Sequence, residues 1–84
     1  MIELKDTIEM MQSEDFKERF KAEYYQTKIR YEKLDKMVVK MEAGILNFKP
    51  NCPLELFKEQ KKYMGCYLYT LEVRAEIEGI DLEV

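Results

Sequence analysis

Basic and aromatic residues on two segments of the chain are of the types that could bind a nucleotide. Arg30 belongs to the first segment, and Tyr67 and Arg74 belong to the second. A guanidinium group can bind phosphate oxygens in a bidentate manner, and a tyrosine ring can stack on a base. Lys33 and Tyr63 are further candidates on the same side. These five residues form the ligand-binding site that the sequence predicts.

The same side chains have a structural interpretation. Tyrosine and arginine also seal the edges of helix-helix seams, with their apolar parts packed and their polar ends in water. Glu23, which the predicted pairing of the helices places near Arg74, could neutralise that guanidinium. The residues Tyr69 and Val73 widen the apolar arc of the second segment, and a wide arc indicates a protein-protein surface. Ligand site and subunit interface both stay open here.

Catalytic and metal-binding constellations are missing from the sequence. There is no His to act as a general base, and no Gly-rich phosphate loop or nucleophile elbow is present. Cys52 and Cys66 are the only cysteines. On one helix they would lie roughly 20 Å apart, too far for a disulfide. We therefore expect a protein without enzyme activity, cofactor or metal site.

Two helices must position these residues. The first is predicted over 14–43 and the second over 53–78, since each carries an apolar or aromatic stripe with alternating steps of three and four residues. A short helix over 2–12 precedes them, and a tail over 79–84 follows, which we expect to be frayed. The predicted fold class is all-α, a single domain over 1–84 consisting of an antiparallel two-helix hairpin with a short N-terminal helix. The stripes run through Phe20, Tyr24, Thr27, Tyr31, Leu34, Val38 and Met41, and through Leu54, Phe57, Lys61, Met64, Leu68, Leu71 and Ala75.

Opposite charges beside the two stripes predict how the helices align. The expected ion pairs join Glu42 to Lys58, Lys28 to Glu72 and Glu23 to Arg74. The same alignment brings Tyr31 to Met64 or Leu68, and Met41 to Leu54 or Phe57. Lys61 falls on the stripe itself, with its stem along the seam and its ammonium group in water.

Local signals predict the ends of the helices. Ser13 is the expected N-cap of the first long helix. Gly44 and Gly79 are the expected C-terminal stops, with Ile80 folding back as a cap contact. The apolar residues of the connection, Ile45, Leu46 and Phe48, are expected to cover the end of the hairpin.

One segment, YMGCYLYTLEV, also has the composition of a strand. The helical stripe continues through it, so helix is favoured. Gly65 then lies inside a helix, which indicates a close backbone approach, opposite Asp35 in the predicted alignment.

Composition limits the partners. A core of 84 residues is marginal alone, so we expect a homo-oligomer. The net charge is -3, which disfavours long nucleic acid, although residues 16–49 hold nine Lys or Arg against five acids. This local positive charge suits a small anion. No stretch is apolar and long enough to span a membrane, and reduced thiols suit a cytosol.

The runs ERFKAEYYQTKIRYEKL and CPLELFKEQKKYMGCYLYTLEVRAEIEGI resemble the crAss-phage-related family of small phage and prophage proteins. The resemblance covers roughly residues 17–78, and Phe57 departs from its pattern, which has Leu there. The matching residues are Lys33, Leu34, Gln60, Met64, Tyr67, Leu71 and Arg74.

That resemblance implies a phage accessory protein in the host cytoplasm. Small phage proteins of this format include oligomeric sponges that capture nucleotide immune signals. The leading hypothesis is immune evasion by binding and sequestering a nucleotide signal. Direct inhibition of a host defence protein is one alternative, and a structural or assembly role in the phage particle is another.

Overall fold

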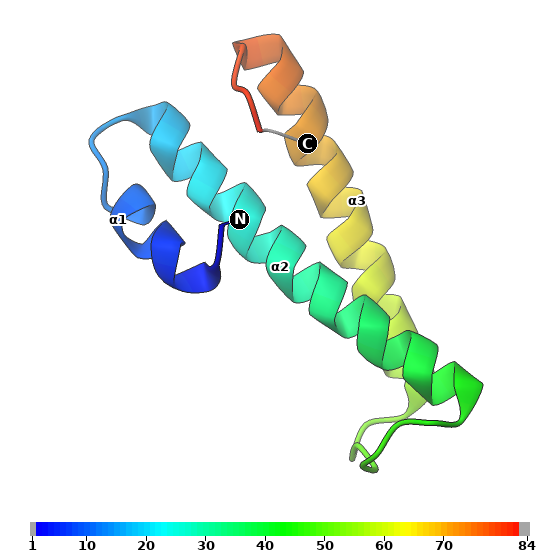
Figure 1. Cartoon of the computed structure of the whole chain (residues 1–84). Coiled ribbons are helices and arrows are strands. Elements are labelled where there is room, and N and C mark those ends of the chain that lie inside the picture. Colours follow the sequence, from blue (N-terminus) through cyan, green and yellow to red (C-terminus); the bar gives the residue numbers. More distant parts are fainter. Residues whose placement is uncertain (1, 83–84) are drawn as a thin grey trace.

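The chain folds into a helical hairpin with a short helical segment docked on its first long helix (Figure 1). The computed structural model describes residues 2–82. Its elements are a 3-10 helix η1 (Leu4–Asp6), α1 (Thr7–Met11), α2 (Phe16–Ala43) and α3 (Leu54–Glu78). Residues 2–82 contain no strand, so the predicted all-α class is confirmed. The segment with strand-like composition lies inside α3.

The predicted C-terminal end of α2 at Gly44 is confirmed, whereas the predicted N-cap, Ser13, is wrong. Asp15, and not Ser13, is the N-cap, because its carboxylate accepts a hydrogen bond from the backbone N–H of Lys17 at 2.9 Å. The hydroxyl of Ser13 accepts from the N–H of Asp15 at 3.0 Å and so supports the cap from two residues earlier. At the other end Gly44 has φ 74°, and the N–H of Ile45 donates to the Lys40 carbonyl at 3.0 Å.

The N-terminal segment is less regular than the helix predicted over 2–12. The Asp6 carboxylate accepts from the Glu3 N–H at 2.9 Å, which starts the 3-10 turn. Thr7 is buried, and its hydroxyl donates to the Leu4 carbonyl at 2.6 Å. The side-chain amide of Gln26 on α2 donates to the same hydroxyl at 2.9 Å. This polar junction fixes the short segment on the side of α2 away from α3 (Figure 1).

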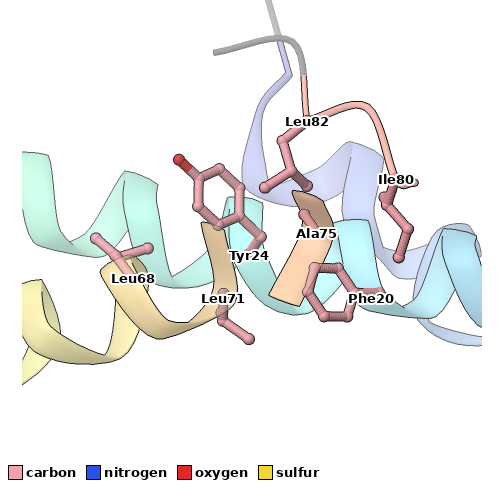
Figure 2. Close-up of a cluster of buried hydrophobic side chains, with 7 residues drawn as sticks. All are labelled: Phe20, Tyr24, Leu68, Leu71, Ala75, Ile80 and Leu82. Atoms are coloured by element: carbon pink, nitrogen blue, oxygen red, sulfur yellow. The ribbon is translucent and has the colours of Figure 1, made fainter. Parts of the chain in front are cut away.

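The core lies between α2, α3 and the returning C-terminal tail. Figure 2 shows its side chains converging from these three segments. Tyr31 packs against this cluster, which contains Leu68, in agreement with the predicted register. The described pairings do not test the Met41 contact, which stays a prediction. The buried cluster consists of Phe20, Tyr24, Leu68, Leu71, Ala75, Ile80 and Leu82.

The predicted ion pairs have different outcomes. Glu42 and Lys58 are 3.8 Å apart, as predicted. Lys28 and Glu72 both approach the Tyr24 hydroxyl, which donates to the Glu72 carboxylate at 2.7 Å and lies 3.4 Å from the Lys28 Nζ. The buried phenol thus lies between the two charges that were expected to pair directly.

Arg74 was wrongly assigned to Glu23. Its guanidinium forms an ion pair with Glu78, one helical turn later, at 3.4 Å. The same group lies over the Phe20 ring, 5.0 Å from its centroid. An (i, i+4) partner on the same helix is always within reach, whereas a partner across the seam depends on how far the helices diverge.

The residues after Gly79 are not frayed as far as the structure describes them. Gly79 has φ 68°, and the Ile80 N–H donates to the Ala75 carbonyl at 2.8 Å, as the predicted cap requires. Ile80 and Leu82 are only 6% and 4% exposed. The Tyr25 hydroxyl donates to the Leu82 carbonyl at 2.7 Å. The predicted tail over 83–84 lies outside the described residues.

Two further expectations fail at Gly65 and in the connection. A Cβ added to Gly65 would meet the Tyr31 hydroxyl at 3.7 Å, an ordinary van der Waals distance, so no close backbone approach requires glycine there. Ile45 and Phe48 are 69% and 58% exposed, so they do not cover the end of the hairpin.

The molecule is elongated, with principal extents of 43 × 25 × 19 Å and a radius of gyration of 15.0 Å. A compact domain of this length would have a radius of gyration of about 12 Å. Within residues 2–82, no helix has the length and apolar character needed to cross a membrane.

Candidate functional site

Helical spacing places three of the predicted site residues on one flank of the hairpin. Residues on a helix advance by about 100° each, so Tyr67 and Arg74 lie on the same side of α3, next to the side of α2 that carries Arg30. Arg30 is exposed and has no ion pair or hydrogen bond within residues 2–82. Tyr67 is also exposed. The described contacts do not join these three side chains to one another.

Two of these five residues already have intramolecular polar partners. Arg74 is held between Glu78 and the Phe20 ring, as described above. The Tyr63 hydroxyl donates to the Glu59 carboxylate at 3.2 Å. A ligand phosphate would therefore compete with Glu78 for Arg74, while Arg30 would be free to bind it.

Lys33 lies elsewhere. It lines a depression of about 580 Å³ between α2 and the N-terminal segment, together with Ile2, Ile29 and Lys36. Because that segment docks on the side of α2 away from α3, Lys33 does not share a depression with Tyr63 or Tyr67 there.

A groove on the opposite flank of the hairpin was missed by the sequence reasoning. It lies between the C-terminal half of α2 and the N-terminal half of α3 and has a volume of about 560 Å³. We call it the lysine–tyrosine groove. It is lined by Tyr31, Val38, Glu42, Lys58, Lys61, Lys62, Gly65, Cys66, Tyr69 and Thr70.

Ion pairs hold two of the three lysines in this groove. Lys58 pairs with Glu42 at 3.8 Å, and Lys61 pairs with Asp35 of α2. The hydrogen bond from Lys61 to the Asp35 carboxylate raises the pKa of Lys61, so this ammonium group stays charged at neutral pH. Lys62 has no ion-pair partner within residues 2–82. The groove thus offers one uncommitted cation near two aromatic rings, those of Tyr31 and Tyr69.

The sequence contains part of the information needed to predict this groove. Lys62 and Tyr69 are seven residues apart and so share one flank of α3. Gly65 leaves space beside Tyr31, and this space becomes part of the groove. The sequence predicts that the two helix backbones approach each other closely at Gly65, and such an approach would have filled this space.

Metal-binding and thiol chemistry find no support among the described side chains. Within residues 2–82 no group of three or more Cys, Asp or Glu side chains could hold a metal ion. Cys52 and Cys66 are free and exposed.

Comparison with known proteins gives one match. A family model described as Sequestin matches residues 14–77, which is about three quarters of the chain and includes α2 and nearly all of α3. The predicted relation to crAss-phage proteins is not shown by this match. Neither the curated proteins nor the solved structures include a match.

Proposed function

The chain belongs to the Sequestin family, and we propose that it acts by sequestering a small ligand without chemically changing it. The family match is the observation that carries this proposal, because the family's name refers to sequestration. We further propose that the ligand is a nucleotide signal, and that the protein is a phage accessory protein that blocks host defence in the host cytoplasm.

The lysine–tyrosine groove supports a nucleotide better than the other depressions do. Its volume of about 560 Å³ is similar to that of the depression at Lys33, but only the groove is lined by aromatic rings, those of Tyr31 and Tyr69. Tyr69 is exposed and could stack on a base, and Lys62 could bind a phosphate group. Charge also favours a small anion over a long polyanion, since the chain as a whole has a net charge of -3.

The flank with Arg30, Tyr67 and Arg74 is the competing location for the same function. It offers an uncommitted guanidinium and an exposed ring. It is less favoured because Arg74 is held by Glu78. The two locations lie on opposite sides of α3, so single substitutions can separate them.

Isothermal titration calorimetry would test the proposal with cyclic dinucleotides, cyclic trinucleotides and ADP-ribose derivatives. We expect binding of at least one nucleotide and a loss of at least tenfold in affinity for Lys62→Ala and Tyr69→Ala. Lys40→Ala is the matched control, because Lys40 is an exposed lysine of α2 outside the groove. The ligand should be recovered unchanged after incubation.

Each other outcome has a defined meaning. Loss of affinity in Arg30→Ala and Tyr67→Ala alone would move the site to the opposite flank. An absence of heat with every nucleotide would overturn nucleotide capture. Cleavage of the ligand would overturn a purely binding role.

Direct inhibition of a host protein is the second candidate function. The observation that favours it is the exposed apolar surface on α3, where Tyr63, Val73 and Ile77 face solvent. A structural role in the phage particle has only the elongated shape in its favour.

A further inference from the structure

The face of α3 opposite its buried side carries a second heptad stripe, which reaches the edge of the lysine–tyrosine groove at Cys66 and Thr70. Leu56, Tyr63, Thr70 and Ile77 lie seven residues apart on this face. Cys66 follows Tyr63 by three residues, and Val73 follows Thr70 by three residues. All six are exposed. Leu56, Tyr63 and Ile77 are 51%, 61% and 78% exposed. Such a regular stripe is the pattern of a helix that packs against another helix.

The area of the molecule indicates that a surface of interface size remains to be covered. The accessible surface is 6326 Å². A folded monomer of 10.2 kDa would expose about 5300 Å². The difference of about 1000 Å² is close to the roughly 800 Å² that each partner contributes to a stable protein-protein interface.

We infer that two copies of this chain pair through the outer faces of α3 in an antiparallel arrangement. In the alignment we assign, Thr70 lies opposite Cys66 of the partner subunit, and Tyr63 lies opposite Val73 of the partner subunit. This alignment also brings Lys62 to Glu76 of the partner subunit, twice by symmetry. The two Tyr67 rings then meet on one side of the interface, and the two Tyr69 rings meet on the other.

Charge complementarity favours this alignment over two others. Parallel pairing would place Glu59 against Glu59 of the partner subunit on the stripe, where two carboxylates repel each other. The next antiparallel alignment, shifted by one heptad, would place Glu55 against Glu76 of the partner subunit, again with like charges. The assigned alignment avoids both like-charge contacts and pairs Lys62 with a carboxylate, and it places Glu59 opposite Ile77 of the partner subunit.

The pairing does not depend on the proposed function, but it affects ligand binding, because Glu76 of the partner subunit would compete with a ligand phosphate for Lys62. Tyr69 lines the lysine–tyrosine groove, so the partner's Tyr69 would extend that groove across the interface. In the dimer, Tyr67 and Arg74 of both copies would lie on the same side of the interface.

Site-directed disulfide formation tests the alignment. In a Cys52→Ser background, the added substitution Thr70→Cys should give a covalent dimer under mild oxidation, because position 70 lies opposite Cys66 of the partner subunit. Adding Cys66→Ser should abolish it. The background variant, which retains only Cys66, should stay uncrosslinked, since its two Cys66 residues would be offset by about four residues, or roughly 6 Å along the helix axis.

The remaining outcomes overturn the inference. Efficient crosslinking of the background variant would indicate parallel pairing, and crosslinking of Tyr63→Cys in place of Thr70→Cys would indicate the shifted alignment. Light scattering at micromolar concentration should give a dimeric mass for the unaltered chain and a monomeric mass for Ile77→Glu. A monomeric mass for the unaltered chain would refute the pairing, whatever the calorimetry shows.

Discussion

Tyr24 is the buried polar residue on which the seam between the two long helices depends. Its side chain is fully buried, while its hydroxyl donates to Glu72 at 2.7 Å and lies 3.4 Å from Lys28. We expect Tyr24→Phe to reduce the free energy of unfolding by about 1–2 kcal/mol, because a hydrogen bond to a charged acceptor is lost. Urea denaturation at pH 7 would measure this loss. No change in the midpoint would contradict a stabilising role of the hydroxyl.

The same phenol predicts a dependence on alkaline pH. Burial, followed by the hydrogen bond and charge of Glu72, raises the pKa of Tyr24 well above its ordinary value of 10.0. The unfolded state therefore loses this proton before the folded state does, so Tyr24 contributes less to stability as pH rises above about 10. Denaturation at pH 9 and pH 10.5 should show a smaller loss for Tyr24→Phe than for the unaltered chain. Equal losses would show that other groups account for the effect.

Leu82 tests whether the returning tail belongs to the core. Its side chain is 4% exposed and lies in the cluster with Phe20 and Tyr24. We expect Leu82→Ala to reduce the free energy of unfolding by about 2–3 kcal/mol, toward the lower end for a buried leucine because the tail can adjust. Ile45→Ala, at a side chain 69% exposed in the connection between α2 and α3, is the control. Equal effects of the two substitutions would contradict a packed tail.

At the scale of the elements, Gly65 weakens α3. It lies in the middle of Leu54–Glu78, and an added Cβ would meet only the Tyr31 side chain, at 3.7 Å. Alanine has a higher helix propensity than glycine by about 1 kcal/mol. We therefore expect Gly65→Ala to raise the free energy of unfolding by about 0.5–1 kcal/mol in thermal or urea denaturation. Gly44→Ala should have the opposite sign, since Gly44 has φ 74°.

At the scale of the whole molecule, the elongated hairpin leaves much apolar surface in water. If two copies cover it, dissociation accompanies unfolding, and the Tm must rise with protein concentration. We expect a rise of several degrees between 1 and 100 µM by calorimetry, and almost none for Ile77→Glu. A Tm independent of concentration for the unaltered chain would show that the hairpin is stable as a single copy.

Local patterns by themselves determined the two long helices and their pairing at one end of the hairpin. Alternating steps of three and four residues predicted both long helices, and the glycines at 44 and 79 predicted their ends. These features depend on neighbours within a turn or two, so sequence periodicity records them. The Glu42–Lys58 pair was predictable for a different reason, because the short connection keeps that end of the hairpin close.

Tertiary packing decided the rest. The docking of Thr7 on Gln26, the return of Leu82 onto Tyr25 and the partner of Arg74 all depend on how far apart the helices stand. The spacing of side chains along one helix does not predict the distance between two packed segments. The lysine–tyrosine groove has the same origin: it exists because α2 and α3 leave space beside Gly65, which only the three-dimensional arrangement of the two helices defines.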